Sequence, residues 1–366
     1  MNRYAVILAG GGGTRFWPLS RQNSPKQLLN LSGNDIMINE TIARLEGVVP
    51  INNTFIVTGE AQAASLKSMI SDSLPKQNII CEPVGRNTAP CILYAAMLLE
   101  RYHGEGVMCI LPSDHFIEDI AQVQHTLSKS MERAEQSDSL ITIGIKPTFA
   151  ATGYGYICFD KSEESNGFYT VEDFVEKPSY KVAEHYFRSG QYLWNSGMFI
   201  WKTSVIIESF GRFLPKMYDK MQEIMESMPA TNYIGEAQAT HTTTSKISQL
   251  YPQLQSISID FGIMERADNV LVIPGDFGWN DVGSWDSLGA IFKPDDNGNI
   301  IKAEHIGIDT KNCIVYGNGR LISTIGLESL IVVNTDDALL ICPKSRAQDV
   351  KTIVEKLKQD GKGDLL

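Results

Sequence analysis

The feature that most constrains this chain is an apolar run, Tyr4–Ala9, that ends in four consecutive glycines, Gly10–Gly13. A short apolar run bounded by glycine predicts a buried strand. Glycine also leaves the main-chain N–H groups of the following turn open to a ligand. Such a concavity suits phosphate oxygens, and it lets a flat base approach the main chain closely. We therefore expect the chain to begin with a strand and an anion-binding loop.

Two common glycine loops do not fit this run. A dinucleotide fingerprint needs a third glycine where Arg15 stands when Gly10 and Gly12 are taken as the first two. A P-loop ends in Gly-Lys followed by Ser or Thr, whereas this loop ends in Thr14-Arg15. What remains is an anion site with Arg15 as its own cation and Lys26 as a second one. The alternative is a plain strand-to-helix turn with solvated basic residues.

Further apolar runs alternate with helix-like segments and predict a Rossmann-like, mostly parallel mixed sheet flanked by helices. These runs are Thr54–Thr58, Gly106–Leu111 and Leu140–Gly144. Ligands of such sheets bind beyond the carboxyl ends of the strands. We therefore expect the glycine run and the turn at residues 112–115 to share one crevice.

The pattern changes twice after the predicted sheet. From about residue 155 it is mixed, with a strand-like run at 155–159 and helical stretches near 179–188 and 203–226. After residue 297 short β-like runs alternate with turn residues, at 300–301, 313–316, 330–333 and 338–342, and a helical tail follows near 346–359. The sequence thus predicts a catalytic domain over residues 1–290 and a small β-rich C-terminal domain over residues 291–366.

Composition limits the partners and the compartment. The 366 residues carry a formal net charge of -11, so the surface as a whole should repel nucleic acid and anionic membranes. The six cysteines are scattered without a CxxC pair, which indicates reduced thiols in a cytoplasmic protein. We find no stretch of membrane-spanning length. A phosphate-bearing ligand must then be held by a local cluster of cations and main-chain donors.

The glycine loop becomes specific through the residues around it. The segment Leu8-Ala-Gly-Gly-Gly-Gly-Thr-Arg-Phe-Trp-Pro-Leu-Ser-Arg21, followed by Pro25-Lys26-Gln27, resembles the N-terminal signature of sugar nucleotide pyrophosphorylases, in the branch of the mannose-1-phosphate guanylyltransferases. Further motifs fit that branch in order along nearly the whole chain: residues 82–90, 111–115, 174–178, 194–199, 258–265 and 278–285. The resemblance implies the nucleotidyltransferase fold.

The resemblance also implies an activity: transfer of GMP from GTP to mannose 1-phosphate, with release of pyrophosphate. Two polyanions must then meet, so chemistry depends on positioning and on cancelling charge. Asp114 and the family's matching carboxylate, Asp281, are expected to hold Mg²⁺. The catalytic set is Arg15, Lys26, Asp114, Lys177 and Asp281. Some relatives add a phosphomannose isomerase domain; this chain ends too early for one, so isomerase activity is not expected.

The remaining binding residues are carried over from the family motifs. For the nucleotide they are Leu8, Ala9, Gly10, Gly11, Gly12, Gly13, Thr14, Arg15, Lys26, Glu82, Gly85, Arg86, Asn87, Thr88, Ser113 and Asp114. For the sugar phosphate they are Gly153, Tyr154, Gly155, Glu176, Lys177, Asn195, Gly197 and Asp281, while Asp260 and Glu265 belong to the sugar side or to the scaffold. A phosphate nucleophile is already ionised at neutral pH and needs no base, so His115 is expected to be structural.

Several alternatives stay open at this stage. Asp114 could cap a helix, Asp281 could bond within its loop, and the motif at 174–178 could be a turn fixed by Pro178. The reaction could use another pair, such as glucose 1-phosphate with UTP, dTTP or ATP. The chain could also be a non-catalytic regulator that binds a nucleotide sugar. The β-rich C-terminal region could support a homodimer, although no pairing edge is evident.

Overall fold

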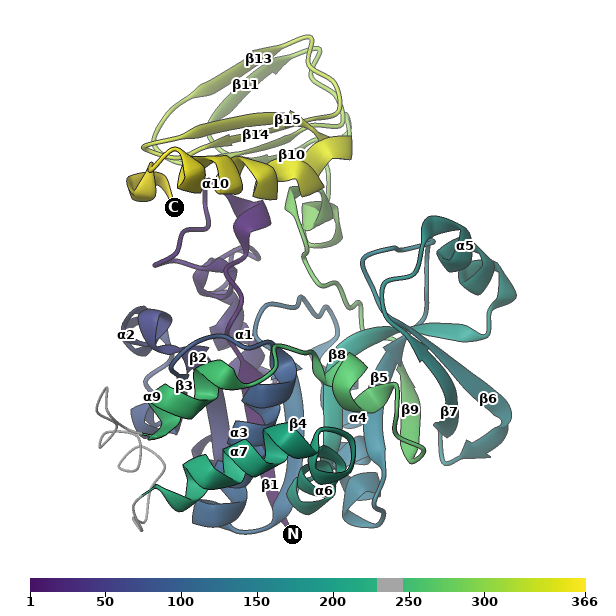
Figure 1. Cartoon of the computed structure of the whole chain (residues 1–366). Helices are drawn as coiled ribbons and strands as arrows, with labels where there is room; N and C mark the ends of the chain where they lie inside the picture. The colour runs from purple at the N-terminus through teal and green to yellow at the C-terminus, as the bar shows by residue number, and fades with distance from the viewer. Residues whose placement is uncertain (229–245) are drawn as a thin grey trace. The chain divides into compact units, whose positions relative to one another are not determined.

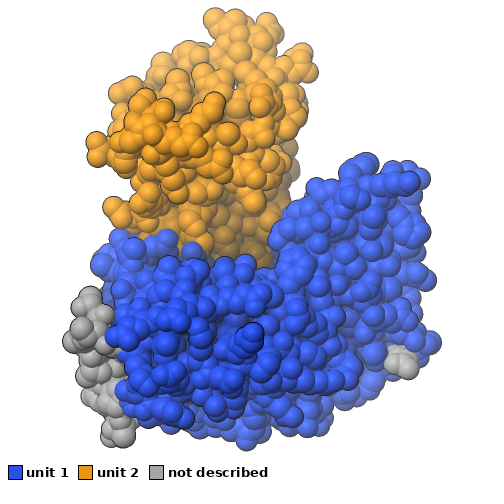
Figure 2. Space-filling model, in the orientation of Figure 1, with its two compact units in different colours: residues 1–10, 41–113, 117–279 blue, residues 11–40, 114–116, 280–366 orange. Residues whose placement is uncertain are grey.

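A computed structural model describes residues 1–228 and 246–366, which contacts divide into two compact units (Figure 2). Unit 1 contains residues 1–10, 41–113 and 117–279, and unit 2 contains residues 11–40, 114–116 and 280–366. The chain therefore passes from one unit to the other five times, and neither unit is a continuous stretch. The sequence boundary expected near residue 290 stays a prediction.

Unit 1 is built on a nine-stranded sheet with the order β3-β2-β1-β4-β8-β5-β9-β7-β6 (Figure 1). The strands are β1 (Asn2–Leu8), β2 (Thr54–Gly59), β3 (Ile79–Glu82), β4 (Gly106–Pro112), β5 (Leu140–Ile145), β6 (Tyr156–Ser165), β7 (Phe168–Val175), β8 (Tyr192–Lys202) and β9 (Val270–Gly275). The strands β7 and β8 run opposite to the others, since β4 and β5 both pair antiparallel with β8, and β9 and β6 both pair antiparallel with β7. The expected mostly parallel mixed sheet is confirmed.

Helices cover the sheet of unit 1. They are α2 (Glu60–Met69), α3 (Thr88–His103), α4 (Ile120–Glu135), α5 (Tyr180–Ser189), α6 (Thr203–Phe213), α7 (Pro215–Glu226) and α9 (Lys246–Leu250), while α1 (Met37–Ala43) crosses the division between the units. Residues 89–99 of α3 are all buried, because α6 and α7 pack against a helix that is apolar on every side. The helical stretch expected over 203–226 is two helices, because Pro215 cannot donate the hydrogen bond that would continue α6.

Unit 2 holds the expected β-rich C-terminal region. One sheet has the order β10-β12-β14-β15, formed by β10 (Ile300–Lys302), β12 (Ile314–Gly317), β14 (Leu330–Asn334) and β15 (Leu339–Pro343). A second sheet pairs β11 (His305–Ile308) with β13 (Ile322–Ile325), two strands that the sequence did not indicate. Successive pairs are parallel except β14 with β15, and α10 (Val350–Gln359) follows.

The core of unit 2 joins distant parts of the chain. Phe16, Trp17 and Leu29, from the N-terminal segment, share one apolar cluster with residues of the β-rich region such as Ile314 and Ile331. Short helical turns complete the two units: η1 (Thr14–Phe16), η2 (Lys26–Leu28), η3 (Ile51–Asn53), η4 (Lys76–Asn78), η5 (Tyr251–Gln253), η6 (Asp260–Met264), η7 (Trp285–Ala290), η8 (Lys344–Asp349) and η9 (Gly363–Leu365). Within the described ranges, no helix has the length and apolar character that crossing a membrane requires.

Candidate active site

The two loops singled out by the sequence leave adjacent parallel strands of unit 1. Leu8 at the end of β1 lies opposite Pro112 at the end of β4, and the amide of Ser113 donates to the Leu8 carbonyl at 3.2 Å. The amide of Ala9 donates to the Val57 carbonyl of β2 at 2.8 Å. The carboxyl ends of these strands therefore meet at one edge of the sheet, as expected. The shared crevice itself stays a prediction.

Gly13 shapes the glycine loop where it enters unit 2. Its φ is +58°, a left-handed conformation that glycine adopts without steric cost. A Cβ at this position would lie 2.2 Å from the Cβ of Lys26. At Gly10 and Gly11, by contrast, a Cβ would meet nothing within 4 Å. Gly13 is thus the member of the run that lets the chain at Lys26 lie directly against the loop.

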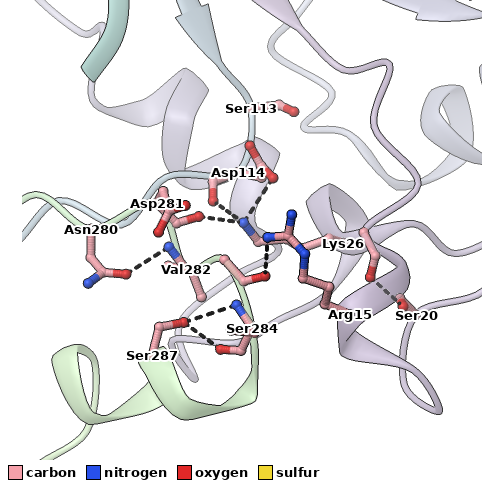
Figure 3. A network of polar contacts seen from close by, with 12 residues as sticks. Arg15, Ser20, Lys26, Ser113, Asp114, Asn280, Asp281, Val282, Ser284 and Ser287 are labelled. Carbon is pink, nitrogen blue, oxygen red and sulfur yellow. Dashed lines mark hydrogen bonds and ion pairs between the residues drawn. The ribbon is translucent and has the colours of Figure 1, made fainter. Parts of the chain in front are cut away.

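Lys26 is the centre of a polar network in unit 2 (Figure 3). Its Nζ donates to the Asp114 carboxylate at 2.8 Å, to the Asp114 carbonyl at 2.8 Å and to the Asp281 carbonyl at 2.7 Å. The Lys26 side chain is only 5% exposed, whereas that of Asp114 is 34% exposed. An ammonium group has three N–H donors, and all three are used here. Lys26 therefore holds the segments at Asp114 and Asp281 together.

The charge of Asp114 is set by its neighbours. Burial alone would raise the pKa of this carboxyl, but the ammonium of Lys26 and the neighbouring His115 outweigh burial and lower the pKa below its ordinary value. Asp114 is therefore an anion at neutral pH. A side chain that is ionised and one-third exposed can offer an oxygen to a ligand cation while it stays paired with Lys26.

The turn that carries Asp281 is held in an unusual conformation. Asn280 and Phe116 exchange main-chain hydrogen bonds at 2.9 and 3.0 Å, which ties this turn to the segment of Asp114. The Asn280 side chain also accepts from the Val282 amide at 2.7 Å. Val282 is fully buried and has a φ of +48°, which is rare for a β-branched residue. Backbone strain of this kind persists only where surrounding contacts enforce it.

Arg15 belongs to the same unit. Its guanidinium donates to the carbonyl of Gly283 at 3.2 Å, one residue beyond Val282. Unit 2 thus brings together four of the five predicted catalytic residues: Arg15, Lys26, Asp114 and Asp281. Among the described residues, no group of three or more His, Cys, Asp and Glu side chains could hold a metal ion by itself. A metal bound here would need oxygens from a ligand or from water.

The predicted sugar-phosphate residues lie in unit 1, apart from Asp281. Asn195 on β8 is fixed on every side: its Nδ2 donates to the Asp260 carboxylate at 2.8 Å, and its Oδ1 accepts from the amide of Gly197 at 3.1 Å. Its own amide donates to the carbonyl of Gly155 at 2.9 Å. A Cβ on Gly155 would lie 2.5 Å from a carboxylate oxygen of Glu176. These contacts bring Gly155, Glu176, Asn195 and Gly197 together.

The surroundings of Asp260 raise its proton affinity. Burial, followed by the negative charge of Glu176, raises the pKa of Asp260 to about 6. The Glu176 side chain is only 10% exposed and pairs with the ammonium of Lys177, whose side chain is 62% exposed. Lys177 has a φ of +48° immediately before Pro178, a second strained position within a predicted motif.

Aromatic rings gather around one more predicted residue, Tyr154. Tyr154, which stands between Gly153 and Gly155, contacts Trp194 and Trp279 edge to face, with ring centroids 5.0 and 5.3 Å apart. Trp194 is 4% exposed, so its ring serves as packing for the loop.

The motif at 82–90 is partly internal. Glu82 is only 4% exposed, and its carboxylate accepts from the hydroxyl of Tyr251. Burial raises the pKa of Glu82 to about 7, although hydrogen bonds from Tyr251 and Cys91 act in the opposite direction. A side chain placed in the core supports the fold directly. Its contact with guanine stays a prediction, as does that of the exposed Gly85.

The end of that motif starts α3. Asn87 is the N-cap, and its side chain accepts from the Thr88 amide at 2.8 Å. Its φ of 68° and ψ of -174° fall in a region that glycine alone visits readily. The Thr88 hydroxyl accepts from the amide of Ile259 at 2.9 Å, and Arg86 donates to the carbonyl of Pro252. Both residues fasten the motif to the segment at 252–259.

Three residues were missed by sequence reasoning. Asn280 and Phe116 position the turn of Asp281, and Thr142 donates to Asn195 Oδ1 at 3.3 Å. A polar residue inside the apolar run of β5 was a signal for Thr142. The pairing of residues 116 and 280 could not be predicted from the sequence around either residue, because it depends on contacts between distant segments.

Two known protein families match this chain. Residues 4–297 match the nucleotidyl transferase family, and residues 303–357 match the MannoseP isomerase/GMP-like beta-helix domain. This chain belongs to the nucleotidyl transferase family. The family resemblance and fold class expected from the sequence are confirmed, and the second match agrees with the parallel ladders of β10, β12 and β14.

Relatives of the family align over almost the whole chain. The xanthan biosynthesis protein XanB of Xanthomonas campestris is 39% identical over 98% of this chain and 74% of its own length. The mannose-1-phosphate guanylyltransferase of Escherichia coli K12 is 36% identical over 98% of this chain and 74% of its own length. A solved structure described as mannose-1-phosphate geranyltransferase from Thermus thermophilus superposes with a TM-score of 0.86 at 32% identity, covering 98% of this chain and 100% of that one.

Proposed function

We propose that this nucleotidyltransferase transfers GMP from GTP to mannose 1-phosphate, giving GDP-mannose and pyrophosphate. The sugar phosphate attacks the α-phosphorus in line, and the bond to pyrophosphate breaks. Because the phosphate oxygen is already ionised at neutral pH, no general base is required. The protein's part is to hold two polyanions and to offset the charge that develops on the leaving pyrophosphate.

The observation that carries this proposal is the Lys26 network of unit 2. One ammonium fixes the carboxylate of Asp114 and the main chain of Asp281, and the guanidinium of Arg15 bonds to the same turn. Charged groups that are fixed before the substrate arrives act strongly on phosphate, because little reorganisation is needed. All N–H groups of Lys26 already have protein acceptors, so we assign the direct grip on the triphosphate to Arg15 first. Lys26 contributes its charge and holds Asp114 in place.

The residues present fit a Mg²⁺ ion. This ion is usually held by one or two carboxylates together with substrate phosphates and water. Asp114 and Asp281 supply two carboxylates, and the lowered pKa of Asp114 keeps its carboxylate ionised. When bound, the metal would neutralise phosphate charge. Asp114 would keep its second role as the partner of Lys26.

The sugar side of the proposal uses unit 1. Asn195 and Asp260 are joined by a hydrogen bond, and the charge of Glu176 acts on Asp260, so the three supply donors and acceptors suited to sugar hydroxyls. The exposed Lys177 can reach a phosphate. The names of the Escherichia coli enzyme and of a putative mannose-1-phosphate guanylyltransferase from Vibrio cholerae, 36% identical to this chain, support GTP and mannose 1-phosphate as the substrate pair.

The deciding experiment is pyrophosphate release from a matrix of substrates. GTP, ATP, UTP and dTTP are each combined with mannose 1-phosphate and with glucose 1-phosphate, with Mg²⁺ and with chelator. We expect release only with GTP, mannose 1-phosphate and Mg²⁺. Pyrophosphate release with another substrate pair would support the reaction type but contradict the assignment of the base and the sugar. If no combination released pyrophosphate, a non-catalytic binding protein would be favoured.

A variant at Asp114 tests the metal assignment. Asp114→Asn keeps the shape of the side chain but removes its charge, so we expect kcat to fall by about 100-fold or more, as for loss of one key electrostatic group. The fall should be accompanied by a higher Mg²⁺ requirement. The matched control is Asp296→Asn, an exposed aspartate of unit 2, which should leave kcat unchanged. Full turnover of Asp114→Asn at low Mg²⁺ would contradict the assignment.

A further inference from the structure

A pocket in unit 1 lies outside every motif that the proposed function uses. It has a volume of about 420 Å³, which falls within the range of small-molecule sites. Its wall comes from the junction of α6 and α7, the first turns of α7, the end of η5 with the two residues after it, and Arg266, which follows η6. None of its residues belongs to the predicted nucleotide or sugar-phosphate sets.

The wall of this pocket is cationic, in a chain whose net charge is -11. Lys216, Lys220 and Arg266 line it, and none of its lining residues within 1–228 and 246–366 is an aspartate or a glutamate. The ammonium of Lys220 donates to the neutral side chain of Gln253 at 3.0 Å. Arg266 donates to the main-chain carbonyl of Phe213 at 3.3 Å. Neither contact cancels the positive charge, so three cations converge on one cavity.

The floor of the pocket is apolar. Leu214, Met217 and Leu254 are at most 8% exposed and line the same cavity as the cations. The rim adds the amide side chain of Gln255 and the ring of Pro215. A ligand that fits this lining carries a compact anion at one end and a flat or apolar group at the other.

Phosphate monoesters best match these requirements. A phosphate dianion has three oxygens that can accept from several cations at once, and charge-assisted bonds of this kind are roughly twice as strong as neutral ones. We propose that this pocket binds a phosphate-bearing small molecule with an apolar part, at a site separate from the substrates. The pocket is formed by unit 1 alone, so the inference does not depend on the reaction proposed above.

Met217 offers a reporter inside the pocket. Protein labelled with ¹³C at its methionine methyl groups is titrated with phenyl phosphate, and the Met217 signal is assigned by its loss in Met217→Leu. We expect this signal to shift in a saturable way, and benzyl alcohol, which lacks the phosphate, to leave it in place. No shift at millimolar phenyl phosphate, or an equal shift with benzyl alcohol, overturns the proposal.

Charge variants complete the test. In Lys216→Gln/Lys220→Gln the Kd for phenyl phosphate measured at Met217 should rise by about tenfold or more, because two charge-assisted contacts are lost. The control Lys351→Gln/Lys356→Gln removes two exposed lysines of α10 and makes the same change in net charge. Its Kd should match that of the parent protein. Equal Kd values for the two double variants would show that the pocket does not bind the phosphate.

Discussion

Gly13 shows how a single residue sets the geometry of the unit 2 network. Its left-handed φ and its contact with Lys26 leave no room for a side chain. Gly13→Ala should therefore lower the free energy of unfolding by about 2 kcal/mol or more, through the cost of a left-handed alanine and the added clash. Urea denaturation measures this loss. Gly11→Ala is the matched control, since no atom lies within 4 Å of its new Cβ; an equal effect of the two changes would contradict the argument.

Glu82 makes stability depend on pH at the scale of one side chain. Its pKa is raised from 4.5 to about 7 in the folded protein. The folded state then binds more protons than the unfolded state between these values, so stability falls as pH rises from about 4.5 to about 7. Glu82→Gln is neutral throughout and still accepts from Tyr251.

The stability advantage of Glu82→Gln over the parent protein should accordingly grow across that interval, by up to about 3 kcal/mol if the full shift is expressed. Free energies of unfolding measured at pH 5 and pH 8 test this. The exposed Glu208→Gln should show no such growth. A constant difference for Glu82→Gln would mean that its carboxyl titrates normally in the fold.

At the scale of elements, the turn at 280–283 depends on Val282, whose φ of +48° costs energy that its burial offsets. An alanine at this position would still have the energetic cost of a positive φ, whereas a glycine would not. Val282→Gly should thus be as stable as Val282→Ala or more stable, by about 1 kcal/mol. The same pair of changes at Val333, a buried residue of β14 without a positive φ, should rank in the opposite order. Thermal unfolding of the four variants gives both rankings.

Strands that are marked by a continuous run of apolar residues were predictable from the sequence. The strands β1, β2, β4 and β5 are continuous apolar runs that are buried on both faces, and the sequence indicated each of them. The strands β11 and β13 were missed because their isoleucines face solvent: Ile306 is 58% and Ile325 is 71% exposed. Their pairing with each other, rather than burial, defines them.

In the candidate site, too, some features were predictable from the sequence and others were not. Residue types such as the lysine and aspartates of the motifs could be read from the sequence, because phosphate and metal chemistry requires them. The fact that Lys26 bonds to Asp114 and Asp281, rather than standing free, could not be read. It depends on the approach of segments that are far apart in the chain, and on Gly13 for the space that this approach needs.

At the scale of the whole molecule, the division into units predicts which regions unfold together. Residues 11–40 share the core of unit 2 with the C-terminal strands, so opening that core should expose both. Ile331→Ala removes a fully buried side chain of β14 and should cost about 2–5 kcal/mol. Hydrogen exchange should then rise in peptides that cover residues 14–31 as well as in β14, while peptides of β1 and β4 keep their protection.

The control for this experiment is Leu339→Ala on the neighbouring strand β15. The Leu339 side chain is 56% exposed, so its loss should change exchange little in either region. If Ile331→Ala left residues 14–31 as protected as in the parent protein, the shared core would not be a cooperative unit.

The same division has a consequence for synthesis on the ribosome. Phe16, Trp17 and Leu29 emerge early, but their packing partners between Val282 and Val354 are translated much later, and more than half of the 366 residues lie between the two groups. Unit 1 can begin to form its sheet while residues 280–366 are still being made, whereas unit 2 must wait for those residues. During that interval Phe16 and Trp17 lack the residues that they pack against in the folded protein. A nascent chain stalled before residue 300 should therefore be a better chaperone substrate, and a more aggregation-prone one, than its length alone would suggest.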